Sequence, residues 1–181
     1  PDFCINCAAY TAVDKAESEK DLAFLVNGAS VGHLAAVCAK FNTKLIHFST
    51  DYVFDGESET PYKEEDKTGP VSAYGQSKLE GEHLCMKENP DAIIIRTAWV
   101  YSEFGNNFVK TMMHLMKERK ELNVVNDQVG APTYAADLAA AALQIIDSGK
   151  WQPGIYHYSN LGKISWYEFA LEIGKNIQTA C

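Results

Sequence analysis

The sequence predicts an α/β protein built around a doubly wound, parallel sheet. Short apolar runs at 3–7, 45–49 and 92–97 alternate with longer segments whose apolar residues recur with a helical period. Alternation of this kind is typical of successive βαβ units. Three consecutive isoleucines, at 93–95, form the centre of the third run, as expected for a strand that is covered on both faces of a parallel sheet.

The elements of the first half follow from local patterns in the chain. A strand is expected at 3–7, a helix at about 18–41, a second strand at 45–49 and a second helix from Ser72 to about Lys87. The buried face of the first helix is expected to consist of Leu22, Leu25, Val26 and Ala29. Ser72 is a good N-cap residue, so the second helix is expected to begin directly after it.

The second half of the chain is less regular. A helix is expected at 107–119, followed by a short apolar stretch at 122–125, an alanine-rich helix ending near Gly149 and a strand at 155–158. Thr133 is expected to cap the alanine-rich helix. Ser165 and Glu168 form a capping-box pattern, which predicts that the last helix begins there.

Length and charge limit the classes of function. With 181 residues, of which 46% are hydrophobic, the chain can form one domain, or one domain and part of another. A formal net charge of −8 argues against a general nucleic-acid binder or a membrane-surface protein. No run of about 18 apolar residues is apparent, so no transmembrane segment is expected.

Five cysteines stand at positions 4, 7, 38, 85 and 181. Cys4 and Cys7 are close in sequence, but on a strand their side chains would face opposite sides of the sheet. No second close pair completes a zinc site in this sequence. We therefore predict buried, reduced cysteines, a cytoplasmic location and no metal-ligating set.

Tyr74 and Lys78 are the strongest indication of catalysis. They are four residues apart in the expected helix, so both side chains would lie on one face, about 6 Å apart along the axis. The pKa of a free phenol is about 10, and a nearby ammonium would lower the pKa of Tyr74 toward neutrality. Thr50 follows the strand at 45–49, where open α/β sheets place their active sites. By itself, the spacing of Tyr74 and Lys78 also fits a solvated helix face.

Five longer motifs occur in one order along the chain. They are NCAAYTAVDKAE from Asn6, STDYVFDG from Ser49, RTAWVY from Arg96, GNNF from Gly105 and NDQVGAPT from Asn126. With these motifs the chain resembles the extended short-chain dehydrogenase/reductases and, over nearly its whole length, the dTDP-4-dehydrorhamnose reductase family within them. The resemblance implies a partial Rossmann-type sheet with an interleaved, smaller substrate-binding lobe.

The resemblance also implies roles for particular residues. The catalytic residues would be Thr50, Tyr74 and Lys78. The cofactor, NADPH or NADH, would be bound by Ala8, Ala9, Tyr10 and Thr11 together with Tyr74 and Lys78. The sugar substrate would be contacted by Thr50, Asp51 and Trp99. Other interpretations stay open, because residues 8–11 also fit tight strand-helix packing and Trp99 also fits a core or interface position.

Further polar residues have two interpretations each. Asn106, Gln128 and Thr133 could touch nucleotide or sugar, but they are also typical loop and cap residues. His47, inside an apolar strand, is expected to be a core histidine with satisfied hydrogen bonds. The acidic stretch 57–66 is expected to be a solvated, mobile loop, with a divalent-ion (Mg²⁺) or subunit contact as the alternative.

The resemblance suggests how the chain divides. Residues 1–104 and 122–150 would form mainly the sheet-and-helix core, and residues 105–121 and 151–181 mainly the substrate lobe. In this family a glycine-rich dinucleotide-binding turn precedes the strand at 3–7, and no such run occurs in the sequence. We therefore expect an internal fragment, in which the strand at 3–7 is an exposed apolar edge and which alone binds nicotinamide nucleotide weakly.

The resemblance implies an activity, the reduction of the C4 keto group of dTDP-4-dehydro-L-rhamnose to dTDP-L-rhamnose in nucleotide-sugar biosynthesis. One alternative is another nucleotide-sugar epimerase or dehydratase of the same superfamily. The other is a non-catalytic regulatory subunit that resembles the methionine adenosyltransferase beta subunit. The expected partner is a nucleotide sugar, with a homodimer as a possible assembly, and neither nucleic acid nor a membrane is expected.

Overall fold

The computed structural model describes residues 1–179 and divides into two compact units. Residues 1–97 and 148–158 form the first, called here the sheet unit. Residues 98–147 and those from 159 onward form the second unit. Each unit has strands and a buried apolar cluster of its own.

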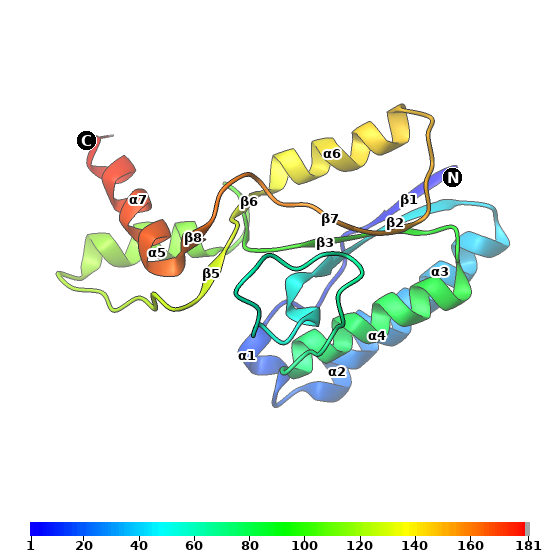
Figure 1. The fold of residues 1–181 in the computed structure, drawn as a ribbon, viewed down its shortest axis with the longest axis horizontal. Coiled ribbons are helices and arrows are strands. Elements are labelled where there is room, and N and C mark those ends of the chain that lie inside the picture. The colour runs from blue at the N-terminus through cyan, green and yellow to red at the C-terminus, as the bar shows by residue number, and fades with distance from the viewer. Residues whose placement is uncertain (180–181) are drawn as a thin grey trace. The chain divides into compact units, whose positions relative to one another are not determined.

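Four parallel strands form the sheet of the first unit (Figure 1). They are β1 (Phe3–Asn6), β2 (Lys44–Thr50), β3 (Ile93–Thr97) and β7 (Gly154–His157), in the order β1-β2-β3-β7. The register between β2 and β3 places Ile46 beside Ile93 and Thr50 beside Thr97. The strands predicted for this unit are thus confirmed, and with them the parallel α/β fold.

Among its described residues, the sheet unit contains four α-helices, one π-helical turn and one 3₁₀ turn. The helices are α1 (Val13–Ala16), α2 (Lys20–Phe24), α3 (Ser30–Lys40) and α4 (Ala73–Glu88). A π-helical turn, η1 (Leu25–Ala29), joins α2 to α3, and a 3₁₀ turn, η2 (Asp51–Val53), follows β2. Helices α3 and α4 run side by side along one face of the sheet in Figure 1. Val31, Ala35 and Cys85 from these helices meet Leu45 and Ile94 of the sheet in a buried cluster.

The helix predicted at 18–41 is present, but its buried face differs from the prediction. Leu22 and Leu25, expected inside, are 45% and 59% exposed. Ala23, Asn27 and Val31 are buried instead. The helix packs through small residues, because a Cβ on Gly81 of α4 would overlap the backbone carbonyl oxygen of Asn27. A prediction based on large apolar side chains therefore selects the wrong face.

The second unit has two small sheets and three helices among the described residues. β4 (Val100–Tyr101) pairs in parallel with β6 (Thr133–Tyr134), and β5 (Val129–Gly130) pairs antiparallel with β8 (Ile164–Ser165). The helices are α5 (Phe108–Glu118), α6 (Ala135–Asp147) and α7 (Trp166–Thr179). Met112 of α5 packs with Ala170 and Ile173 of α7 to form the buried cluster of this unit.

The last helix begins as predicted, whereas the expected cap of the alanine-rich helix is wrong. The Ser165 amide donates to Glu168 Oε2 at 2.8 Å, and the Glu168 amide donates to Ser165 Oγ at 3.1 Å, which is a reciprocal capping box. Thr133 lies in β6, and its hydroxyl donates to the Ala131 carbonyl oxygen at 3.4 Å. It therefore does not cap α6. The stretch 122–125 forms neither a helix nor a strand.

The boundary between the units differs from the expected division. Residues 98–104 and 122–147, expected with the sheet, belong to the second unit. Residues 151–158, expected with the substrate lobe, belong to the sheet unit. Strand β7 explains this placement, because it pairs with β3 along its whole length and completes the sheet.

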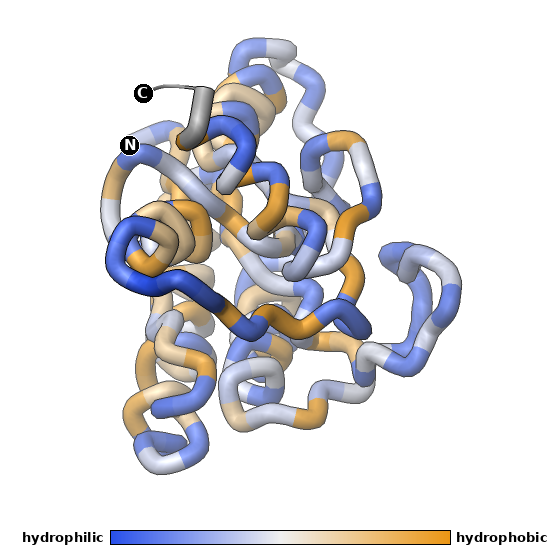
Figure 2. Tube along the Cα trace, turned by 90° about the vertical axis from the view of Figure 1, so that its left-hand side faces the viewer, coloured by the Kyte–Doolittle hydropathy of each residue, from blue (hydrophilic) through white to orange (hydrophobic). Residues whose placement is uncertain are grey.

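One helical stretch, 20–40, is long and apolar enough to cross a membrane by length and composition alone. This differs from the expectation that the chain has no such stretch. A core helix of a globular protein meets the same criterion, and this one places Val31, Ala35 and Cys38 in the buried cluster. Polar and apolar residues are mixed along the helical segments (Figure 2).

The described cysteines are free thiols, but they are not all buried. Cys38 and Cys85 are buried, Cys4 is half-buried and Cys7 is exposed. The prediction of buried cysteines is therefore wrong for Cys7, because this residue follows the end of β1. Cys181 lies outside the described residues.

Candidate active site

Helix α4 carries Tyr74 and Lys78 in its first turns. Ser72 caps the helix as predicted, because its side chain accepts a hydrogen bond from the Gly75 amide at 3.1 Å. Lys78 is buried, and its Nζ donates to the Phe48 carbonyl oxygen at 2.7 Å. The helix is thus joined to β2 directly at a residue predicted to be catalytic.

Thr50 is the last residue of β2, and its hydroxyl has several neighbours. It accepts a hydrogen bond from the Tyr52 amide at 3.2 Å and donates one to Asp51 Oδ1 at 3.1 Å. A side-chain hydrogen bond also connects Thr50 with Tyr74. The Tyr52 ring packs edge-on against Tyr74, with ring centroids 5.5 Å apart. The structure therefore brings Thr50, Tyr74 and Lys78 to one end of the sheet.

Burial decides the protonation of Tyr74 and Lys78. It raises the pKa of Tyr74 to about 12, although the hydrogen bond with Thr50 lowers it. It lowers the pKa of Lys78 to about 8, although the charge of Glu82 raises it. The expected lowering of the Tyr74 pKa is therefore wrong, because desolvation is the largest cause of the shift and raises it. The Lys78 ammonium bonds the Phe48 carbonyl oxygen. Near neutral pH Tyr74 is a neutral phenol and Lys78 is mostly an ammonium.

Asp51 lies beside Thr50 at the start of η2. Burial raises the pKa of its carboxyl group, while hydrogen bonds from the Thr50 hydroxyl and from the backbone amides of Asp51 and Tyr52 lower it. The carboxyl group thus adjoins the Thr50 hydroxyl, which is predicted to be catalytic. Asp51 is one of the residues predicted to contact the sugar substrate, and that contact stays a prediction.

The loop after β1 carries Ala8, Ala9, Tyr10 and Thr11, the residues predicted to meet the cofactor. Ala8, Ala9 and Thr11 are exposed and Tyr10 is half-buried. The Ala8 amide donates to Asn6 Oδ1 at 3.1 Å, so the turn out of the strand is held by a side chain of the strand itself. Small exposed residues at the carboxyl end of a parallel strand leave the backbone accessible to a dinucleotide.

Asn27, in the π turn η1, holds this loop to helix α4. Its Oδ1 accepts a hydrogen bond from the Tyr10 amide at 2.8 Å, and its Nδ2 donates to the Tyr10 carbonyl oxygen at 3.0 Å and to Ser77 Oγ at 3.0 Å. Sequence reasoning missed this residue. An asparagine within an otherwise apolar helical run was the signal that could have found it.

A buried ion pair joins α4 to β3. Glu82 and Arg96 are 1% and 5% exposed. Arg96 Nε donates to Glu82 Oε1 at 2.9 Å, and Arg96 Nη2 donates to Glu82 Oε2 at 2.7 Å. Ser49 Oγ donates to the same Oε1 at 2.5 Å. Sequence reasoning missed this pair too, although an arginine inside a buried strand is a signal that a partner is required.

The acidic stretch 57–66 is largely exposed, as predicted, but it is anchored to the sheet unit. Tyr62 stacks on Phe54, with ring centroids 4.3 Å apart. The backbone carbonyl of Glu64 accepts a hydrogen bond from Arg96 Nη1 at 3.3 Å, and its carboxylate accepts one from the His157 amide at 2.9 Å. The segment is therefore fastened by the Arg96 side chain of β3 and by a backbone amide of β7.

His47 is fully buried in β2, as predicted. Its Nδ1 bonds Asn6 Nδ2 at 3.0 Å, whereas its Nε2 has no partner within the described residues. Burial, and secondarily the charge of Lys78, lowers the pKa of His47 to about 3. The imidazole is thus neutral, and the prediction of satisfied hydrogen bonds is correct for one ring nitrogen only.

Trp99 belongs to the second unit and has a positive φ of 49°. Its ring stacks on Trp166, with centroids 3.5 Å apart and an interplanar angle of 11°. A Cβ on Gly130 would lie only 2.6 Å from Trp99 Cε2. The indole is therefore packed between a second indole and a glycine of β5, and its predicted contact with sugar stays a prediction.

A family model described as the RmlD substrate binding domain matches residues 1–181. The chain belongs to this family. The match spans both units, so helix α4 of the sheet unit and the helices of the second unit are all part of the RmlD substrate binding domain.

Two curated relatives of this RmlD-family chain are about half identical to it and are longer than it. The dTDP-4-dehydrorhamnose reductase of Sinorhizobium fredii is 51% identical over 175 residues, which are 94% of this chain and 59% of the relative. The spore coat polysaccharide biosynthesis protein SpsK of Bacillus subtilis is 46% identical over 173 residues, covering 96% and 60%. The chain therefore spans about 60% of the length of these relatives.

A solved structure supports the fold. The crystal structure of dTDP-4-dehydrorhamnose reductase from Bacillus anthracis in complex with NADP is 43% identical, with a TM-score of 0.93, and the match covers 98% of this chain and 63% of that one. The partial Rossmann-type fold predicted for this RmlD-family chain is thus confirmed.

The described residues of this RmlD-family chain offer no group of three or more His, Cys, Asp or Glu side chains that could hold a metal ion. The Mg²⁺ contact considered for the stretch 57–66 therefore has no support within residues 1–179.

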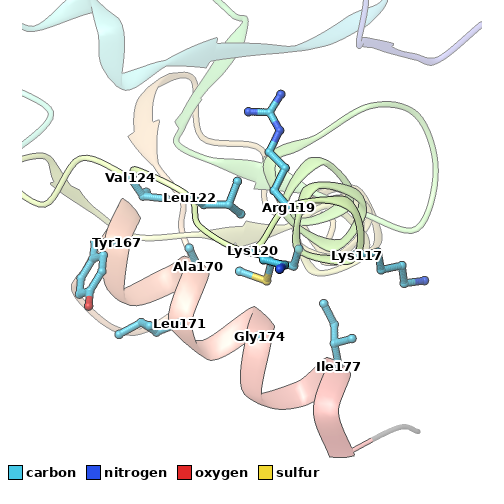
Figure 3. Close-up of a pocket in the computed structure, with 11 residues that line it drawn as sticks. Lys117, Arg119, Lys120, Leu122, Val124, Tyr167, Ala170, Leu171, Gly174 and Ile177 are labelled. Carbon is cyan, nitrogen blue, oxygen red and sulfur yellow. The ribbon is translucent and has the colours of Figure 1, made fainter.

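A separate groove of about 340 Å³ lies between α5 and α7 in the second unit of this RmlD-family chain (Figure 3). Leu122, Ala170 and Leu171 contribute to its apolar lining. The charged ends of Lys117 and Arg119 point away from it in Figure 3. The lining of the groove therefore combines apolar side chains with basic ones, and it does not include the residues predicted to be catalytic.

Proposed function

We propose that the full-length protein reduces the C4 keto group of dTDP-4-dehydro-L-rhamnose to dTDP-L-rhamnose with NADPH or NADH. The observation that carries this proposal is the meeting of Thr50, Tyr74 and Lys78 at the carboxyl end of β2. Relatives called dTDP-4-dehydrorhamnose reductase, 51% and 47% identical, support the choice of substrate. The NADP complex of a 43% identical structure supports a nicotinamide cofactor.

The residues of the chain fit such a cofactor. Ala8 and Ala9 leave exposed backbone at the end of β1, and the buried Lys78 ammonium lies at the end of β2. In the proposed site, the loop 8–11 would contact the dinucleotide and Lys78 would donate to the nicotinamide ribose. Bound nicotinamide would supply the hydride that reduces the C4 carbon.

Tyr74 would provide the proton that balances the reaction. A ketone that gains a hydride at carbon needs one proton on its oxygen to become an alcohol. Tyr74 is a neutral phenol below its pKa of about 12, and in this form it can donate that proton. Thr50 would hold the same oxygen through its hydroxyl, and Lys78 would stabilise the phenolate that remains.

The substrate would also contact two further residues that were predicted from the sequence, Asp51 and Trp99. Asp51, whose carboxylate adjoins Thr50, would accept hydrogen bonds from sugar hydroxyls. Trp99 would offer the edge of a ring that is held on Trp166. The second unit would supply most of the substrate lobe. A cytoplasmic location and a homodimer are part of the same proposal.

Turnover of defined nucleotide sugars tests the proposal. The full-length protein is incubated with dTDP-4-dehydro-L-rhamnose and either NADPH or NADH, while loss of reduced nicotinamide and formation of dTDP-L-rhamnose are followed together. Equal consumption of the nicotinamide and the keto sugar supports a reductase. Conversion without net loss of nicotinamide would indicate an epimerase or dehydratase, and no conversion would indicate a non-catalytic subunit.

A further inference from the structure

Two successive residues of β2 bind two residues of α4 that are one helical turn apart. The Phe48 carbonyl oxygen accepts from Lys78 Nζ at 2.7 Å, and Ser49 Oγ donates to Glu82 Oε1 at 2.5 Å. Lys78 and Glu82 are four residues apart, so they share one face of the helix. That face of the helix is therefore bonded to the strand at two points, one helical turn apart.

Arg96 of β3 completes the attachment from the neighbouring strand. It lies beside Ser49 in the strand register and donates a hydrogen bond to each carboxylate oxygen of Glu82. It also contacts the Glu64 carbonyl oxygen at 3.3 Å and the Phe54 ring, whose centroid is 5.0 Å from Cζ. A two-pronged bond to a fixed guanidinium defines distance and rotation more closely than a single hydrogen bond does.

Stability alone does not account for such a pair. Charges that are buried lose their hydration, and apolar residues of similar volume often stabilise a protein as well or better. The geometry here points to a different benefit. Rotation of α4 about its axis would move Glu82 away from Arg96 and would move Lys78 away from Phe48 at the same time.

We propose that Glu82 and Arg96 are positioning residues for the reaction at Tyr74 and Lys78. By locking the rotation of α4 against β2 and β3, they keep the Lys78 ammonium and the Tyr74 hydroxyl at the end of β2 where Thr50 lies. The expected kinetic effects rest on the proposed reductase function. The effect on the position of Lys78 does not depend on that function.

Glu82 also acts on Lys78 through its charge. The titratable groups that face Lys78 are Glu82 and Tyr74 on α4 and His47 on β2. Tyr74 and His47 are neutral near pH 7. Arg96 is paired with Glu82, but Glu82 is the charged group that acts on the pKa of Lys78. The carboxylate of Glu82 therefore supports the charged form of Lys78, whose pKa burial lowers to about 8.

Two variants of the full-length protein test this role. Glu82→Gln keeps the shape of the side chain but removes its charge. The double variant Glu82→Met with Arg96→Leu removes both buried charges and keeps apolar volume, so it is expected to fold. In both, kcat should fall about 10- to 100-fold with little change in KM for the nucleotide sugar, and the alkaline limb of the kcat profile should move to lower pH.

Cys85→Ala is the matched control, because Cys85 is also buried on α4 but packs in the apolar cluster. It should lower the unfolding temperature while kcat and the pH profile stay as in the wild type. A double variant that folds and retains the wild-type kcat and pH profile would overturn the proposal.

A direct titration of Lys78 separates this inference from the proposed function. The pKa of Lys78 is measured by carbon NMR of labelled lysine in the full-length wild type and in both variants, with Lys78→Met to assign the signal. We expect a lower pKa of Lys78 in Glu82→Gln than in the wild type, and an unchanged pKa would overturn the positioning role. Because this titration needs no turnover, it decides the matter even if the wild type reduces no keto sugar.

Discussion

Lys78 Nζ lies 2.7 Å from the backbone carbonyl oxygen of Phe48. The ammonium is thus held by the strand that ends at Thr50, and it bonds a group that cannot be changed by substitution of a side chain. This contact places a charged group next to the proposed reaction centre and keeps it away from bulk water, with Lys78 only 2% exposed. The chemistry expected of the site depends on that placement.

Tyr74→Phe in the full-length protein should lower kcat by about 10²- to 10⁴-fold. The ring and its packing against Tyr52 are kept, so KM for the nucleotide sugar should change little. Steady-state kinetics with both substrates varied measures the two parameters. Tyr167→Phe removes a hydroxyl from an exposed residue of α7 and serves as the control. An undiminished kcat for Tyr74→Phe would remove the phenol from the chemistry.

Lys78 should make the protein more stable as pH rises from about 8 toward 10.5, the range between its pKa in the fold and its ordinary value. In this range the unfolded chain binds more protons than the folded one, so the free energy of unfolding increases with pH, by roughly 2 kcal/mol. Tyr74 acts oppositely at higher pH, because its raised pKa contributes stability that is lost between about 10 and 12.

Denaturant unfolding of the wild type and Lys78→Met across this pH range measures the effect. The free energy of unfolding of the wild type should rise with pH relative to that of Lys78→Met, because the variant lacks the titrating ammonium. Parallel pH dependences in the two proteins would show that Lys78 keeps an ordinary pKa in the fold.

Gly81→Ala should destabilise the protein by about 1–3 kcal/mol or more. A Cβ at this position would overlap the Asn27 carbonyl oxygen, and a backbone atom cannot move aside as the end of a flexible side chain can. Gly174→Ala in α7 is the control, because its Cβ would meet Met116 at an ordinary 3.5 Å. That variant should gain up to about 1 kcal/mol of helix propensity. Equal unfolding temperatures of the two variants would contradict the close packing of α4 on η1.

Asn27→Ala should weaken NADPH binding by the full-length protein about tenfold. The substitution removes the hydrogen bonds that tie Tyr10 to Ser77, and each buried bond of this kind is worth roughly 1 kcal/mol. The loop 8–11 would then have to be ordered when the cofactor binds. Fluorescence titration with NADPH measures the dissociation constant. Asn89→Ala, a buried asparagine at the other end of α4, should leave it unchanged.

Much of the sheet unit could be predicted from the sequence, because its signals are local. Strands of a parallel sheet are continuous apolar runs, and β2 and β3 were found in this way. Tyr74 and Lys78 were recognised by their spacing, and Thr50 by its position after a strand. The Ser165 capping box was equally visible, since both of its partners lie within one turn.

The remaining parts of the site depend on residues that are distant in sequence. Asn27 and Ser77 are 50 positions apart, and Ser49 and Glu82 are 33 apart. No local pattern reveals such pairs. The raised pKa of Tyr74 belongs to the same class, because the spacing of Tyr74 and Lys78 shows their shared helix face but not the desolvation that raises the pKa of the phenol.

The π turn at Leu25–Ala29 has a consequence for how this helix tolerates changes in length. Residues 23, 27, 31 and 35 are all buried at intervals of four, which is wider than the 3.6-residue period of an α-helix but is accommodated by a wider turn. Deletion of a single residue here would restore an ordinary helix and rotate everything before it by about 100° relative to α3. Asn27 would then face away from the loop it holds. Natural variation in this segment should therefore favour substitutions and avoid one-residue insertions or deletions.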